Sequence, residues 1–348
     1  MNFAPTRRAL LRSSLGACVF AATLLLAGCG TATAANPAVA TQETHSADIA
    51  FAGTKVRLAN AQEGARELAS RDEWVRLSSQ WNRAAIVGTP EPVGDEALLA
   101  HLASAAREWT PAEQARLAAS LKRLSPRFEA LHVPLPPLVV LVKTDGRESA
   151  GAPHTRGRAV FLPLTDFPAD DAKLDGLMAH ELFHVVSRHA PELARRLYAV
   201  IGFEPVPELV WPASLQAVRI VNPDAPYHRD AMRLARPEGG EALVMPILVA
   251  GRPIDRTKNE TFFNVLRVRF IEVSVDGAQT LPRLDAKGDA VDASPELVKL
   301  YMDKLGGNTG YVIHPEETMA DNFMLLVTGA KARNPALIER VREVLLTQ

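Results

Sequence analysis

The chain has 348 residues, of which 39 are basic and 40 are acidic, giving a formal charge of −1 at pH 7. This balance, without a run of Lys and Arg, excludes a strongly basic surface of the kind that binds nucleic acid. The two cysteines lie within the first 30 residues, so a disulfide-stabilised domain is also excluded. The rest of the chain, about 300 residues, can bury one large core or two modest cores.

The first 28 residues are typical of a bacterial export signal. Arginines precede an apolar run that is too short for a membrane-spanning helix, which needs about 20 residues. The run ends in LAGC, residues 26–29, which resembles the lipobox of bacterial lipoproteins. The resemblance implies cleavage before Cys29 and a lipid on its sulfur; a chance cysteine in an ordinary secreted protein is the alternative. Because Gly30 is not acidic, we expect a lipid-anchored envelope protein on the outer membrane, facing the periplasm.

The next two segments are predicted to be a tether and a helical region. Residues 29–50 are small and polar without periodicity, which indicates a flexible tether. Residues 51–130 are predicted to form an N-terminal helical region, with apolar residues at helical intervals over 74–86. Thr110, Pro111 and Glu113 form the capping signature of a further helix. We expect this region to contribute packing rather than a site.

Residues 131–348 are predicted to form the main domain. Its first half contains two β-branched strands, within 132–144 and 156–164, and then a helix of about 20 residues between Pro168 and Pro191. The second strand is predicted either to lie at a sheet edge, where an extended peptide could pair with it, or to be a core strand. Residues 191–310 look like an insertion, with a helix at 191–203, a loop at 221–230 and strands at 241–251 and 261–277. Helices are expected at 294–307, 314–330 and 334–348, so the chain is predicted to have an α+β fold.

The predicted helix before Pro191 contains a possible metal site in LMAHELFHVVSRH, residues 177–189. His180 and His184 are one turn apart, so both imidazoles leave the same helix face and can reach one zinc ion. Glu181 follows the first histidine and can act as a base beside the metal. His189 is expected to be a cation at the helix end. The alternative is a pair of buried core histidines.

A third ligand has to come from further along the chain. Glu272 and Asp276 lie in a predicted strand, where positions i and i+4 are about 13 Å apart, too far to act together at one metal. Glu317 and Asp321 lie in a predicted helix, one turn apart on one face. Glu317 is therefore the predicted ligand, and we expect Asp321 to accept the other ring N–H of a histidine, His180. The neighbouring Glu316 has Ala320 as its helical partner, so it lacks such a carboxylate.

These residues together resemble the gluzincin metallopeptidases, the thermolysin-like clan. The resemblance covers a small set of positions, His180, Glu181, His184, Glu317 and Asp321. It implies a zincin-like domain, with a mixed sheet, an active-site helix and C-terminal helices, and a Zn²⁺ cofactor. It further implies hydrolysis of peptide bonds in peptide or protein substrates by a zinc-bound water that Glu181 activates. About 130 residues separate His184 from Glu317, more than in compact members, and we expect this insertion to surround the cleft.

The resemblance also implies a Tyr or His that stabilises the oxyanion. His228 and Tyr311 are the principal candidates, with Tyr227 and His314 as neighbours of the same types. Two other functions remain open: a non-catalytic zincin-scaffold lipoprotein for binding or assembly, and a zinc amidase acting on cell-wall material. The expected partners are a substrate and, through Cys29, the membrane. The sequence gives no indication of the oligomeric state.

Overall fold

The computed structural model of the protein describes residues 46–163 and 168–347. The expected signal segment, the lipidation of Cys29 and the tether up to residue 45 lie outside the described residues. From Ser46 onward the chain packs as one unit. No helix within the described residues is long and apolar enough to cross a membrane.

The first sheet has the strand order β1-β2-β4-β6-β5, with the short β3 beside β4. Strands β2, β4 and β6 are parallel, whereas β1 and β5 are antiparallel to their neighbours. Residues 139–142 of β4 are buried, as expected for a central strand covered on both faces. The bounds of the strands are β1 Ala47–Phe51, β2 Thr54–Leu58, β3 Ala106–Arg107, β4 Leu138–Thr144, β5 His154–Arg156 and β6 Ala159–Pro163.

Two expectations for this sheet are wrong. Residues 47–50 are not tether and residues 54–58 are not helical, because β1 and β2 form a hairpin closed at Ala52 and Gly53, which both have positive φ. The strand β6 does not lie at an edge, because β5 pairs with its outer side. The strand β5 has three residues inside a turn-rich segment, too few for an alternating pattern to be recognised.

The helices of the N-terminal region pack against this sheet. They are α1 Ala61–Leu68, α2 Glu73–Leu77, α3 Gln80–Val87, α4 Asp95–Ala103 and α5 Pro111–Ala130. The predicted capping box of Thr110 and Glu113 at the start of α5 is confirmed. The expected helix over 74–86 is divided into α2 and α3, since Ser78 is extended and Ser79 caps the second helix.

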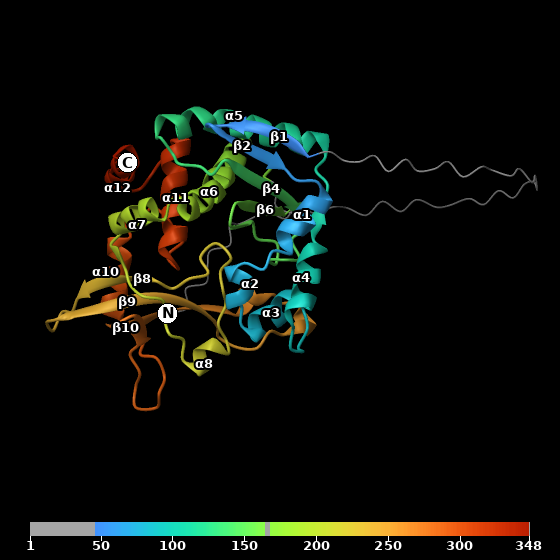
Figure 1. The fold of residues 1–348 in the computed structure, drawn as a ribbon. Coiled ribbons are helices and arrows are strands. Elements are labelled where there is room, and N and C mark those ends of the chain that lie inside the picture. Colours follow the sequence, from blue (N-terminus) through green and yellow to red (C-terminus); the bar gives the residue numbers. More distant parts are fainter. Residues whose placement is uncertain (1–45, 164–167, 348) are drawn as a thin grey trace, which may run out of the picture. The chain divides into compact units, whose positions relative to one another are not determined.

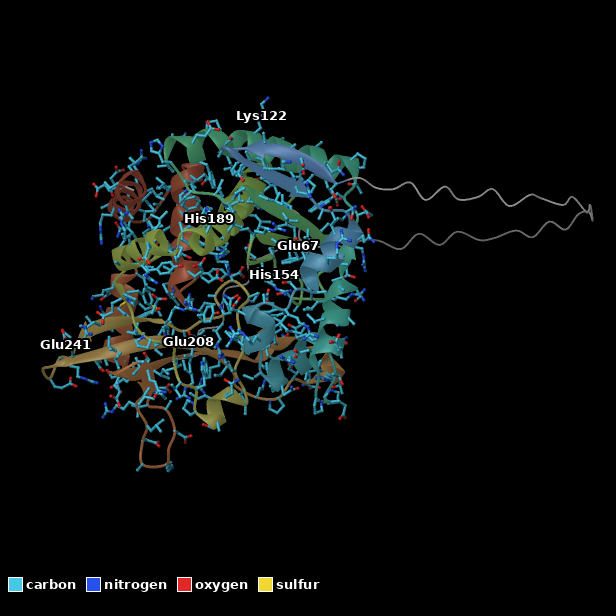
Figure 2. The ribbon with its side chains drawn as sticks, in the orientation of Figure 1. Glu67, Lys122, His154, His189, Glu208 and Glu241 are labelled. Carbon is cyan, nitrogen blue, oxygen red and sulfur yellow. The ribbon has the colours of Figure 1, made fainter. Side chains whose placement is uncertain are left out.

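Four further helices form the layer that carries the candidate site: α6 Asp171–His189, α7 Pro191–Val200, α11 Pro315–Thr328 and α12 Pro335–Leu346. In Figure 1, α6 and α11 lie in the middle of the view, below α5. Phe323 of α11 lies 5.4 Å from Phe128 of α5 and 5.3 Å from Phe183 of α6, measured between ring centroids. This buried aromatic cluster fixes α11 against α6. The opposite side of α5 is exposed, and Lys122 points outward from it (Figure 2).

The second sheet is an antiparallel meander with the order β11-β10-β9-β8-β7. It lies within the expected insertion, and the strand predicted at 241–251 is confirmed as β9. The strand predicted at 261–277 is confirmed from residue 266 onward as β10, whereas residues 262–265 form a short helix that Thr261 caps. The bounds are β7 Phe203–Pro205, β8 Asp230–Ala235, β9 Glu241–Ala250, β10 Leu266–Asp276 and β11 Gln279–Pro282, with α8 Ala213–Gln216, η2 Arg256–Lys258, α9 Phe262–Val265 and α10 Pro295–Lys304. Glu241 lies near the tip of the β8–β9 hairpin, at the left of Figure 2. The fold is therefore α+β, as the sequence predicts.

The expected division of the chain at residue 130 does not coincide with a boundary between cores. One buried apolar cluster includes Phe51 of β1, Leu117 of α5, Phe183 of α6 and Val341 of α12. The cluster thus joins residues from both sides of the division. The second sheet has a smaller core of its own, which includes Met245 and Ile271.

Buried His154 in β5 makes the stability of the fold depend on pH. Its ring stacks on Phe161, with 4.9 Å between ring centroids. Burial, together with the positive charges of Arg156 and Arg188, lowers the pKa of His154 to about 3. In the unfolded chain this histidine takes up a proton below pH 6.5, its ordinary pKa. Its contribution to stability is therefore full above that pH, and falls by roughly 1.4 kcal/mol per pH unit between the two pKa values.

We expect the variant His154→Phe to lose less stability on acidification than the parent protein. The measurement is denaturant unfolding of both proteins at pH 7.5 and at pH 5. Equal losses in the two proteins would show that His154 does not contribute this pH dependence.

Candidate metal centre

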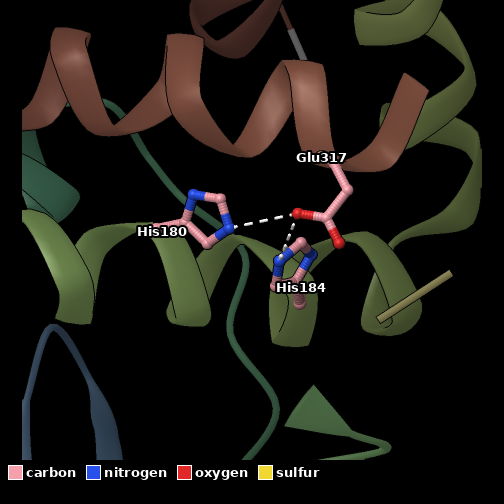
Figure 3. Close-up of side chains that lie close together, drawn as sticks. All are labelled: His180, His184 and Glu317. Carbon is pink, nitrogen blue, oxygen red and sulfur yellow. Dashed lines mark ion pairs between the residues drawn. The ribbon is translucent and has the colours of Figure 1, made fainter. Parts of the chain in front are cut away.

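The packing of α11 against α6 brings the three predicted ligands together (Figure 3). Nε2 of His180 lies 3.3 Å and Nε2 of His184 lies 3.8 Å from the same oxygen, Oε2 of Glu317. The ligand atoms of all three residues lie within 4.8 Å of one another. His184 and Glu317 are buried, and the side chain of His180 is 15% exposed. The predicted proximity of Glu317 to the two histidines is thus observed.

The second nitrogen of each imidazole is held by a carboxylate of α11. Nδ1 of His180 lies 2.9 Å from Oδ1 of Asp321, and Nδ1 of His184 lies 2.7 Å from Oε1 of Glu316. When a carboxylate accepts a hydrogen bond from Nδ1–H, the imidazole keeps its lone pair on Nε2. Both Nε2 atoms are therefore oriented and available as metal ligands.

These two carboxylates are themselves fixed by hydrogen bonds. Thr309 donates its hydroxyl to Asp321, and Tyr198 of α7 donates its hydroxyl to Glu316. Ser187 also donates to Oε1 of Glu316, at 2.6 Å. The sequence does not indicate the role of Glu316, because its partner His184 lies on the neighbouring helix and not on its own.

The donor set fits a zinc ion. Nε2 of His184 is buried and has no hydrogen-bond partner among the described residues. A buried polar atom without a partner is destabilising, and a metal ion that accepts its lone pair removes this cost. Two neutral imidazoles and one carboxylate are ligands that zinc prefers, and three protein ligands leave a position open for chemistry.

Glu181 lies next to this donor set as the sequence predicts. Its side chain is buried, and its Oε2 accepts a hydrogen bond of 2.8 Å from the hydroxyl of Thr155 in β5. Burial, assisted by the negative charge of Glu317, raises the pKa of Glu181 to about 7. A carboxylate with this pKa can both accept and release a proton near neutral pH.

Asp224 is a second buried carboxylate at the site, which the sequence analysis missed. Its Oδ1 lies 4.0 Å from Nε2 of His184, and its ligand atom lies within 4.8 Å of that of Glu181. Burial and then the negative charges of Glu181 and Glu317 raise the pKa of Asp224 well above its usual value. The surrounding groups therefore do not fully stabilise negative charge on Glu181, Asp224 and Glu317 together. A cation bound among these carboxylates would stabilise their ionised forms.

Asn222 also reaches the site from the same loop, residues 221–230. Its Nδ2 donates to Oε1 of Glu317 at 2.5 Å, leaving Oε2 directed at the two histidines. The sequence predicts the loop itself, but not that Asn222 and Asp224 reach the site from it. An Asp and an Asn two residues apart in a loop are too common to indicate a site without the fold.

The two principal candidates for the oxyanion donor, Tyr311 and His228, differ in their position relative to the metal ligands. The ring of Tyr311 is 6.0 Å from that of His180 and the residue is 50% exposed. Partial burial and the charges of Glu317 and Asp321 raise the pKa of Tyr311 above its usual value, so its hydroxyl stays protonated. His228 is buried against Trp211, with 5.0 Å between ring centroids, and it does not belong to the groups of described residues that could hold a metal.

The other two candidates are engaged elsewhere. His314 caps α11, since its Nδ1 accepts the backbone N–H of Glu316 at 3.1 Å. Its Nε2 lies 2.9 Å from the carbonyl oxygen of Tyr227, so a hydrogen bond joins the ring of His314 to the backbone of Tyr227. The guanidinium of Arg229 stacks on the Tyr227 ring at 3.6 Å. Both residues therefore have structural partners.

Two residues set aside in the sequence analysis lie apart from these ligands. Glu272 in β10 pairs with Arg236 and lies 2.8 Å from Nη1 of Arg283. His189 is exposed at the end of α6. Neither residue belongs to the groups of described residues that could hold a metal.

No family model, no curated protein and no solved structure matches this chain. The assignment of its chemistry therefore depends on the residues described above.

Proposed function

We propose that the protein is a zinc metallopeptidase with a zincin-like domain, acting in the cell envelope. The observation that carries the proposal is the unpartnered, buried Nε2 of His184 facing Glu317, with the carboxylate of Glu181 beside it. The lipid anchor at Cys29 and the outer-membrane location stay predictions of the sequence.

In this proposal, His180, His184 and Glu317 would hold the zinc ion. When bound there, zinc acts as a Lewis acid on a peptide carbonyl and makes a nearby water more acidic. Asp321 and Glu316 keep both imidazoles in the tautomer that ligates through Nε2. The carboxylates that hold the two imidazoles are thus supplied by one helix, α11.

Glu181 is the proposed base. Its carboxylate takes a proton from the attacking water, whose oxygen forms the new bond to the carbonyl carbon. As the C–N bond breaks, Glu181 returns that proton to the leaving nitrogen, so the products are a carboxylic acid and an amine. Thr155 holds Oε2 of Glu181 in place during both steps. Tyr311 is the proposed hydrogen-bond donor to the oxyanion, since its ring lies 6.0 Å from that of His180 and its hydroxyl stays protonated.

A non-catalytic scaffold explains Glu181 less well. Burial raises the pKa of the Glu181 carboxyl to about 7, and this burial lowers the stability of the fold at neutral pH. A protein that only binds a partner gains nothing from this cost, whereas a hydrolase requires a base at that position.

The test is cleavage of a mixed peptide library by the full chain loaded with zinc. Mass spectrometry should detect new peptide termini, and these should disappear when zinc is removed by a chelator. Cleavage of cell-wall peptidoglycan amides without cleavage of any library peptide would replace the peptidase by an amidase. Absence of both activities in zinc-loaded protein would reject the hydrolase.

A further inference from the structure

The candidate metal centre is nearly closed to solvent. His184 has no exposed surface, and Glu181 and Glu317 are each 3% exposed. The side chain of the third ligand, His180, is 15% exposed. A peptide is hydrolysed only when its carbonyl group comes within about 3–3.5 Å of the reacting groups. Side chains buried this deeply cannot be reached by a peptide, so hydrolysis requires part of the wall around the centre to move.

One loop segment, residues 222–225, joins two walls of the centre. Nδ2 of Asn222 donates to Oε1 of Glu317 in α11 at 2.5 Å. Oδ1 of Asp224 accepts the backbone N–H of Thr155 in β5 at 2.6 Å. The segment therefore bridges the space between α11 and the edge of the first sheet.

Arg188 ties the same segment to the third wall, α6. Its Nη2 donates to the carbonyl oxygens of Asp224 at 2.6 Å and of Pro223 at 3.1 Å. Its Nη1 donates to the carbonyl oxygen of His184, on the preceding turn of α6, at 2.7 Å. Hydrogen bonds from a charged donor are stronger than those between neutral groups. The guanidinium of Arg188 is thus the strongest single attachment of the segment to the helix that carries the two histidines.

The segment also occupies the edge of the first sheet. Thr155 is the middle residue of the edge strand β5 and lies opposite Val160 of β6. Its backbone N–H bonds to Asp224, and its carbonyl oxygen lies 3.4 Å from Nη2 of Arg188. Both groups are therefore directed away from β6. They are the groups to which an extended peptide would bond by strand addition, so the segment and such a peptide compete for one place.

The chain just before the segment is fixed by the N-terminal helices. The backbone N–H of Val221 donates to Oδ1 of Asn82 at 2.6 Å, and its carbonyl oxygen accepts Nε1–H of Trp74 at 2.9 Å. The hydroxyl of Ser79 donates to the carbonyl oxygen of Arg219 at 2.8 Å. These bonds do not involve the metal centre, so they persist when the segment leaves it. Val221 is therefore a fixed point about which the segment can turn.

We propose that residues 222–225 form a lid that opens to admit the substrate, and that Arg188 is the positioning residue that holds this lid closed. The inference rests on the proposed peptidase function and names the step that precedes hydrolysis. Opening exposes the backbone of Thr155 for an extended peptide and gives access to the ligands. The same motion controls the entry and release of the zinc ion, because His184 is buried beneath the lid.

The experiment measures zinc exchange, which does not require peptidase activity. Stopped-flow mixing with a fluorescent chelator gives the zinc association and release rates of the full chain. A lid changes both rates by the same factor and leaves the Kd for zinc unchanged, whereas a metal ligand changes the Kd. Arg188→Met, which removes the charged donor, should raise both rates at least about tenfold, as expected for loss of a hydrogen bond to a charged group. Arg188→Lys keeps the charge and should recover part of this difference.

Pro223→Gly tests the lid without changing a side chain that contacts a ligand. Glycine makes the segment more flexible, so both zinc rates should rise and the Kd should stay at the parent value. The matched control is Pro253→Gly, a substitution in an exposed loop outside the segment, and it should change neither rate. Circular dichroism checks that each variant is folded.

Peptide kinetics separate the lid from the proposed function. A lid that opens more readily raises the population that binds substrate, so Pro223→Gly should lower KM for a cleaved peptide and leave kcat unchanged. The inference is overturned if Arg188→Met and Pro223→Gly keep the parental zinc rates, or if a changed Kd accounts for their faster release. If exchange depends on the lid but no peptide is hydrolysed, the peptidase function fails and the lid stands. If peptides are hydrolysed while zinc rates and KM are independent of both residues, the lid fails and the peptidase stands.

Discussion

Glu317→Ala should release the zinc ion, and Glu316→Ala should weaken zinc binding without abolishing it. Glu317 presents Oε2 to Nε2 of both histidines, at 3.3 Å and 3.8 Å, so its loss removes a ligand. Glu316 contacts the metal centre only through Nδ1 of His184, at 2.7 Å. Loss of such an outer partner lowers metal affinity by about 10–100-fold, and the loss of a ligand should exceed this range.

The measurement is zinc affinity by competition with a chromophoric chelator, with zinc content determined by mass spectrometry. Circular dichroism checks that both variants are folded, since Glu316 and Glu317 are buried. Glu316→Gln is the matched control, because its side-chain oxygen can still accept the N–H of His184, and it should recover most of the lost affinity. Zinc binding that is unaffected by Glu317→Ala would eliminate Glu317 as a ligand and direct attention to Asp224, which also faces His184.

The features of the site that the sequence predicts involve residues that lie close to one another along the chain. His180, Glu181 and His184 lie within two turns of one helix, so their common face follows from helix geometry. The spacing of Glu317 and Asp321 on α11 follows in the same manner. The contact of Asp321 with His180 joins residues 141 positions apart, and it was predicted because a metal-binding imidazole requires an acceptor at its second nitrogen.

The parts that the sequence does not predict depend on packing between distant segments. Glu316 meets His184 because aromatic side chains set α11 against α6, and nothing in the spacing of residues 314–321 indicates the rotation of the helix. Asp224 and Asn222 reach the site because Arg188 binds the backbone of their loop. The strands β1 and β5 were missed because three to five residues carry too little periodicity.

Glu181→Gln should abolish most of the hydrolysis without loss of zinc. Gln keeps the size of Glu and can still accept the hydroxyl of Thr155, which lies 2.8 Å from Oε2 in the parent protein. It cannot take a proton from water, so kcat should fall by about 10²–10⁴-fold, the usual contribution of a general base. Zinc affinity should stay within a small factor of the parent value, since Glu181 is not one of the three proposed ligands.

The pH profile of the parent enzyme provides an independent check of the same role. A base acts only when it is deprotonated, so kcat/KM should fall as the pH drops below the pKa of Glu181. Burial raises this pKa to about 7 in the metal-free protein, and a divalent cation beside the carboxylate lowers it. The acid limb of the zinc-loaded enzyme should therefore lie below pH 7, and above the ordinary value of a glutamate. A variant Glu181→Gln that retains parental turnover would remove Glu181 from the mechanism, and the base would then have to be Asp224, the other buried carboxylate beside His184.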